Sequence, residues 1–77
     1  MAHHLTIDTY TNDKVTDVRI HTVKDRDDAS ARLYRTLSAP EFGSSFRARA
    51  MARFGDGESD FKVIEPNQVY HIYYEEE

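Results

Sequence analysis

The residues of this chain best suited to chemistry are the carboxylates of one short stretch, "DGESDF", at residues 56–61. Asp56, Glu58 and Asp60 stand at alternate positions, as the first oxygen ligands of a calcium-binding loop do. The rest of that pattern is missing, because the sixth position is Phe61 where glycine is needed and the twelfth is Asn67 where a bidentate glutamate belongs. We therefore interpret this stretch as a solvated acidic turn and expect no metal site.

Other candidate catalytic groups are sparse. Ser44 and Ser45 follow a glycine, but no G-x-S-x-G motif surrounds them and no histidine is near in sequence. If the first strand lay beside the last one, two histidines could approach each other with a carboxylate, which is a metal-ligand set. No spacing in the sequence requires such a metal site. We interpret the four histidines of the chain as surface or partly packed residues: His3, His4, His21 and His71. We expect no enzyme activity and no cofactor.

The length of 77 residues predicts one small domain, residues 1–77. The absence of cysteine excludes a disulfide framework and a thiolate nucleophile, which fits a cytoplasmic protein. No apolar run approaches the roughly 18 residues of a membrane-spanning helix. We expect no membrane partner.

The net charge of −4 is unevenly distributed. Residues 41–53 carry Arg47, Arg49 and Arg53 against one glutamate. Residues 54–77 carry one lysine against seven acidic residues: Asp56, Glu58, Asp60, Glu65, Glu75, Glu76 and Glu77. Because any basic patch would lie beside a stronger acidic one, the pattern argues against a general nucleic-acid coat.

The secondary structure that must position these groups begins with a hairpin. "LTIDTY" and "VTDVRIHTV" both alternate apolar and polar residues, and "TNDK" between them has turn chemistry. Residues 25–38 change to a helical period, with Ala29, Leu33 and Leu37 on one stripe, Asp25 as the N-cap and Pro40 as the stop. "FKVIE" and "QVYHIYY" then predict a second hairpin that turns at Pro66 and Asn67.

The stretch "FRARAMARF", residues 46–54, fits two periods. As a strand it would place Phe46 and Phe54 on one face with three alanines, and a row of arginines on the other face. As a helix it would place phenylalanine or alanine at every fourth position up to Gly55, and alanine favours a helix over a strand. We favour the strand because the alternation has no exception. Either outcome is an α+β fold, a small antiparallel sheet with helix on one face.

The whole chain resembles the small single-domain inhibitors that phages encode, of which anti-CRISPR proteins are the best-known group. The likeness lies in size, acidic charge and the order of "FRARAMARF", "FKVIE" and "QVYHIYY" after a hairpin and a capped helix. Those inhibitors share no common motif, so the resemblance assigns no residue a role. It implies a non-enzymatic protein that blocks a nucleic-acid-handling complex.

We therefore expect a protein-binding module whose partner has a basic surface. The expected contacts are an acidic group, Asp56, Glu58, Asp60, Glu75, Glu76 and Glu77, and an aromatic group, Tyr70, Tyr73 and Tyr74. One alternative is a nucleic-acid binder that uses the row Arg47, Arg49 and Arg53. Another is a structural subunit or homodimer that pairs through an exposed strand edge.

Overall fold

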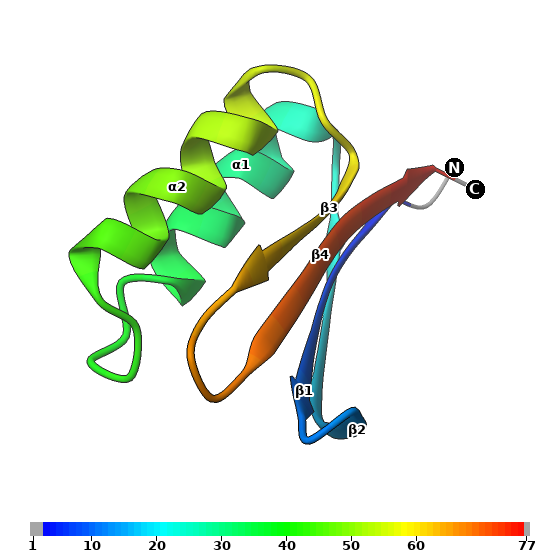
Figure 1. Ribbon diagram of the computed structural model, residues 1–77. Coiled ribbons are helices and arrows are strands. Elements are labelled where there is room, and N and C mark those ends of the chain that lie inside the picture. The colour runs from blue at the N-terminus through cyan, green and yellow to red at the C-terminus, as the bar shows by residue number, and fades with distance from the viewer. Residues whose placement is uncertain (1–2, 77) are drawn as a thin grey trace.

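A computed structural model describes residues 3–76 and confirms an α+β fold. The elements follow one another as β1 (His3–Thr11), β2 (Lys14–Val23), α1 (Arg26–Thr36), α2 (Ser44–Gly55), β3 (Asp60–Ile64) and β4 (Val69–Glu76). The strands form one antiparallel sheet in the order β2-β1-β4-β3. Both helices cover the same face of this sheet (Figure 1). No helix in the described residues is long and apolar enough to cross a membrane.

The predicted N-terminal hairpin is present, and its turn follows from two residues. Asn12 and Asp13 have φ values of 52° and 64°, the left-handed backbone that a two-residue hairpin turn requires and that Asn and Asp tolerate. They join the paired residues Thr11 and Lys14. A β-bulge between Thr9 and Tyr10 shifts the register of the two strands close to this turn.

Helix α1 is also as predicted. The Asp25 side chain accepts a hydrogen bond of 2.8 Å from the amide of Asp28, which caps the first turn. Asp27 and Asp28 lie in that turn and favour the positive end of the helix dipole. The predicted stripe of Ala29, Leu33 and Leu37 is buried against the sheet.

The strand favoured for residues 46–54 is wrong, because this stretch is helix α2. Its buried residues are Phe46, Ala50 and Phe54, which stand four apart, whereas Ala48 and Ala52 are exposed to solvent. A strand would have needed one buried face made of Phe46, Ala48, Ala50, Ala52 and Phe54. Three of these five are alanines, which bury little area and favour helix. Helix propensity therefore prevails over the apparent alternation.

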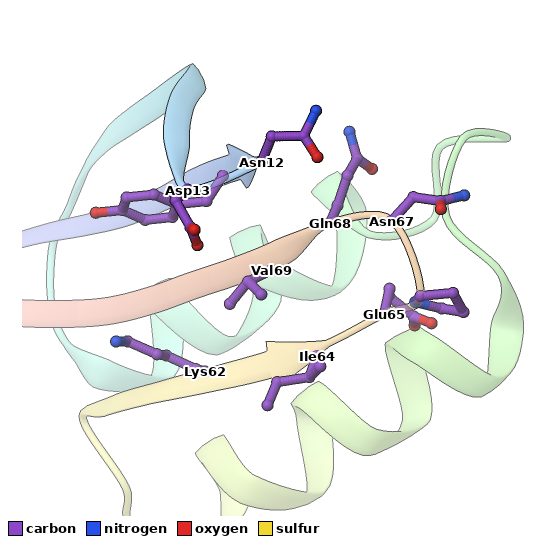
Figure 2. A pocket seen from close by; sticks show the side chains of 10 residues that line it. Asn12, Asp13, Lys62, Ile64, Glu65, Asn67, Gln68 and Val69 are labelled. Carbon is purple, nitrogen blue, oxygen red and sulfur yellow. The ribbon is translucent and has the colours of Figure 1, made fainter.

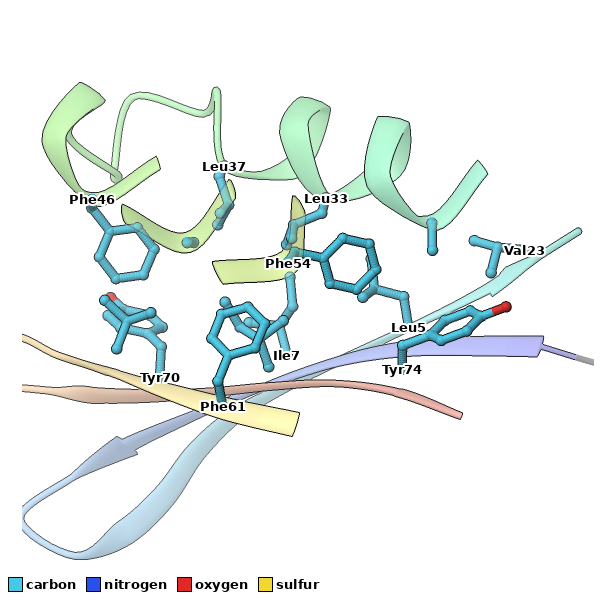
Figure 3. Packing of buried hydrophobic residues seen from close by; sticks show 14 residues of the cluster. Leu5, Ile7, Val23, Leu33, Leu37, Phe46, Phe54, Phe61, Tyr70 and Tyr74 are labelled. Atoms are coloured by element: carbon cyan, nitrogen blue, oxygen red, sulfur yellow. The ribbon is translucent and has the colours of Figure 1, made fainter. Parts of the chain in front are cut away.

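The core lies between the helices and the sheet (Figure 3). Its largest fully buried side chains are Leu5, Ile7, Leu33, Leu37, Phe54 and Ile72. Aromatic rings from the sheet pack edge-on against those of α2, with centroid separations of 4.7 Å for Phe46 and Tyr70 and 6.2 Å for Phe54 and Tyr74. The two central strands supply most of the sheet's fully buried residues, so the core is centred on β1 and β4.

Within residues 3–76, no helix covers the other face of the sheet, which we call the open face (Figure 1). Alternate residues of each strand point to it, and the register aligns them in rows across the strands. One row joins Ile20, Thr6, Tyr73 and Asp60. The apolar residues Val18, Ile20 and Ile64 are 51%, 62% and 70% exposed.

Candidate interaction surfaces

The fold brings the carboxylates predicted for partner binding to one end of the molecule. Asp60 begins β3 opposite Tyr73 of β4, two residues before Glu75. The Tyr74 amide donates a hydrogen bond of 2.7 Å to the Ser59 carbonyl, which ties the α2–β3 loop to the last residues of β4. Asp56, Glu58 and Asp60 therefore lie beside Glu75 and Glu76. Glu77 lies outside the described residues.

The first turn of α1 adds further carboxylates to the same end, because Arg26 connects it to the α2–β3 loop. Its guanidinium donates hydrogen bonds of 2.8 Å to the Ser59 hydroxyl and 2.7 Å to the Glu58 carbonyl. We call this region the acidic end. Its carboxylates are Asp25, Asp27, Asp28, Asp56, Glu58, Asp60, Glu75 and Glu76. Its nearby cations, Lys24, Arg26 and Arg53, are fewer, so a negative potential remains.

Several of these carboxylates have partners within the protein, among them Glu58 and Asp60. Glu58 accepts two hydrogen bonds from Arg53, of 3.0 Å from Nε and 2.8 Å from Nη2. These bonds lower the pKa of the Glu58 carboxyl and raise the pKa of the Arg53 guanidinium. Asp60 hydrogen-bonds to His71, although its side chain remains 73% exposed. Glu58 is thus a structural contact, while Asp60 still faces solvent.

The predicted aromatic group is divided between the two faces of the sheet. Tyr70 and Tyr74, which were predicted as partner contacts, are each only 9% exposed and belong to the core, so they offer a partner little surface. The Tyr70 hydroxyl donates to the Gln68 side chain at 2.6 Å, and the Tyr74 hydroxyl lies 2.6 Å from Nδ1 of His3. Bulk on both sides of β4 reflects its position as a central strand. Tyr73 alone of the three lies on the open face.

Tyr73 is half-buried between neighbouring side chains of the open face. Its ring lies 4.7 Å from that of His71, centroid to centroid, and Asp60 stands opposite it on β3. Burial, followed by the negative charge of Asp8, raises the pKa of the Tyr73 hydroxyl. Tyr73 therefore offers an aromatic surface at the margin of the acidic end.

The predicted arginine row does not exist, because in a helix Arg47 points away from Arg49 and Arg53, and each guanidinium has its own contacts within the protein. Arg47 stands over the Tyr34 ring at 4.9 Å, measured from Cζ to the ring centroid. Arg49 pairs with Glu65 at 2.5 Å. Arg53 bonds Glu58 and also donates to the Lys62 carbonyl at 2.6 Å. Two of the three guanidiniums are neutralised internally, so they present no aligned basic face.

A depression of about 680 Å³ lies at the opposite end of the sheet, between the two hairpin turns (Figure 2). Tyr10, Val69 and Ile64 form a row across β1, β4 and β3 that supplies its apolar part. Asp13, Lys62, Glu65 and other polar residues surround this row. Among the described residues, no group of three or more His, Cys, Asp or Glu side chains could hold a metal ion, here or elsewhere.

Sequence reasoning missed Arg26, which the structure shows to be a central link. Besides its bonds to Ser59 and Glu58, it donates a hydrogen bond of 2.8 Å to the Phe54 carbonyl at the end of α2. Its guanidinium also lies 4.2 Å from the centroid of the Phe54 ring. Nothing in the polar run "KDRDD" distinguishes this arginine from a solvated one.

Comparisons of the chain with family models, with curated proteins and with solved structures each found no match.

Proposed function

We propose that this protein is a non-enzymatic binding module that inhibits a nucleic-acid-handling complex in stoichiometric fashion. The observation that carries the proposal is the acidic end, where two chain segments and the first turn of α1 gather carboxylates beside Tyr73. Such a surface complements the basic channel in which a protein holds DNA or RNA phosphates. The inhibitor would act inside the cell by occupying that channel.

The charge of the acidic end would govern the rate and selectivity of binding more than its final strength. Exposed charges steer a partner of opposite sign, and salt weakens this steering because it screens them. Tyr73 would supply the aromatic contact, since tyrosine is enriched among residues that dominate interface energies. The partner is therefore expected to bind fast at low salt and to release its nucleic acid on binding.

The test uses a variant that keeps the internal ion pair of Glu58 intact. Asp56→Asn, Asp60→Asn and Glu75→Gln together remove three exposed charges from the acidic end. The matched control, Ser38→Lys, Ala48→Lys and Asn67→Lys, changes the net charge by the same amount at exposed positions elsewhere. Both proteins should retain the wild-type circular dichroism spectrum.

Affinity capture from a host lysate supplies the measurement, followed by competition with duplex DNA and with RNA. We expect the wild-type protein to retain a basic partner that either nucleic acid displaces. The association rate of the neutralised variant should fall about tenfold at low salt, and that of the control should not. Equal binding by the neutralised variant, or a captured partner that nucleic acid does not displace, would contradict the proposal. A direct gel shift of DNA or RNA by the protein itself would favour nucleic-acid binding instead.

A further inference from the structure

The two edges of the sheet differ in how they are protected from pairing with another strand. The β3 edge is five residues long, and Arg53 reaches from α2 to bond the Lys62 carbonyl on its outer side. The β2 edge is ten residues long, and seven of those residues are exposed. A long exposed edge strand presents unpaired backbone groups to which a further strand can bind. The structure thus leaves one edge suited to strand addition.

The sequence of β2 reads almost the same in both directions about Arg19. In "VTDVRIHTV", residues equally far from Arg19 are Val18 and Ile20, then Asp17 and His21, then two threonines and two valines. When two identical strands pair antiparallel about a two-fold axis, a residue before the axis faces the residue equally far after it. In such a pair, the apolar side chains of Val18 and Ile20 face each other, and the Asp17 carboxylate faces the His21 imidazole. The strand is chemically complementary to itself.

We propose that the chain forms a two-fold symmetric dimer in which β2 pairs antiparallel with β2 of a second copy, centred on Arg19. The two sheets then join into one continuous sheet. On the open face, Val18 of each copy lies opposite Ile20 of the other. These side chains are 51% and 62% exposed in the single chain, and the pairing removes much of that apolar surface from water.

On the helix side, the pairing gives His21 a hydrogen-bond partner. Its Nε2 atom is buried and makes no hydrogen bond within residues 3–76. Asp17 of the second copy stands opposite, and a turn of the imidazole ring toward the edge brings donor and acceptor together. Buried polar atoms in folded proteins nearly always have partners, so an unpaired one here is informative.

The two Arg19 side chains meet at the axis, where like charges would normally repel. Each guanidinium is held by its own Asp17 at 3.0 Å and by Glu41, and it lies 5.4 Å from the centroid of the Phe42 ring. The two carboxylates neutralise the positive charge, and Glu41 and Phe42 hold each guanidinium against the loop between α1 and α2. The bulge near Thr16 disturbs the strand there, so the strongest pairing runs from Asp17 to His21.

Molecular mass measured against concentration tests the dimer. We expect the mass of the wild-type protein to double between about 1 μM and about 1 mM. Ile20→Lys should raise the concentration of half-dimerisation at least about tenfold, because a lysine opposite Val18 disrupts the apolar contact. The control Ile64→Lys places the same charge on the same face at the other edge and should have no effect. A monomer at every concentration, or disruption by Ile64→Lys and not by Ile20→Lys, overturns the proposal.

Disulfide capture tests the centre of the pairing, since the sequence contains no cysteine. Facing residues of an antiparallel pair have Cα atoms about 4.5–5.5 Å apart, within the range that a disulfide spans. A mixture of the single variants V18C and I20C should therefore oxidise to the mixed disulfide. A dimer centred on Ile20 would link I20C to itself, and one centred on Val18 would link V18C to itself. Either self-linked product overturns the centre at Arg19, and no product at all places the contact away from β2.

Discussion

Replacing Arg26 with alanine should destabilise the fold far more than replacing Arg47, whose side chain contacts a single ring. The side chain makes three hydrogen bonds, to the Phe54 carbonyl, the Glu58 carbonyl and the Ser59 hydroxyl, at 2.7–2.8 Å. It also covers the Phe54 ring at 4.2 Å. Arg26→Ala removes all of these contacts, which hold the end of α2 and the loop before β3 against α1.

The size of the loss follows from these contacts. A hydrogen bond from a charged donor contributes about 1.5–3 kcal/mol, and the contact with the ring about 0.5–1 kcal/mol more. The three bonds share one donor group and are partly exposed, so they do not add fully, and we expect a total of about 2–4 kcal/mol. A domain of this length has about 4–12 kcal/mol of stability in all. The variant should therefore melt about 10–25 °C below the wild type.

Thermal and urea unfolding, followed by circular dichroism, provide the measurement. Arg26→Lys should restore little, because an ammonium group cannot reach three separate acceptors as a guanidinium does. Arg47→Ala is the matched control: Arg47 also stands over a ring, that of the half-exposed Tyr34, and its removal should cost about 0.5–1 kcal/mol. If Arg26→Ala lies within about 0.5 kcal/mol of the wild type, the link between the helices and the loop is not what stabilises this end.

Three further predictions concern the core, the turn and the pH dependence. Leu33→Ala removes a fully buried side chain of α1 and should cost about 2–5 kcal/mol in urea unfolding; a cost below about 1 kcal/mol would contradict the packing described here. Asp13→Gly should raise the melting temperature by about 2–4 °C, because glycine adopts the φ of 64° without strain, and a lower melting temperature would argue against this turn geometry. Burial, then the positive charges of Arg32 and Arg19, lower the pKa of His21 from its usual 6.5. The unfolded chain then binds a proton more readily than the folded one, so His21 should make the protein less stable as the pH falls below about 6.5. His21→Gln should weaken that dependence in unfolding curves measured from pH 8 to pH 5, and an unchanged slope would exclude His21 as its source.

Much of the fold follows from local patterns in the sequence. The two hairpins and α1 each combine a clear hydrophobic period with turn or capping residues, and the structure confirms them. Helix α2 was ambiguous because alanine and phenylalanine at alternate positions also fall every four residues. The exposure of the alanines decides between the strand period and the helix period. In the structure Ala48 and Ala52 face solvent, whereas a strand with that face buried would have covered them. The local pattern cannot supply this information.

The surfaces depend on the order of the strands, which no local pattern contains. The carboxylates were visible in the sequence, but their gathering with the first turn of α1 requires β4 to lie between β1 and β3. The same central position explains why Tyr70 and Tyr74 enter the core. The contacts of Arg26 join residues about thirty positions apart, so spacing along the chain gives no sign of them. The near symmetry of the β2 sequence about Arg19 is visible in the sequence. It indicates pairing with a second copy only because β2 lies at an edge of the sheet.

The adjacency of β1 and β4 bears on the order in which the molecule folds. His3 pairs with Glu76, so the middle of the sheet joins segments from opposite ends of the described chain, while each hairpin needs only its own neighbours. Closing so large a loop has an entropic cost that local contacts do not repay, and chains rich in such distant contacts fold slowly. The hairpins and helices should therefore appear early, and the barrier should be crossed when the first and last strands meet. On a ribosome, that step must wait until β4 has left the exit tunnel.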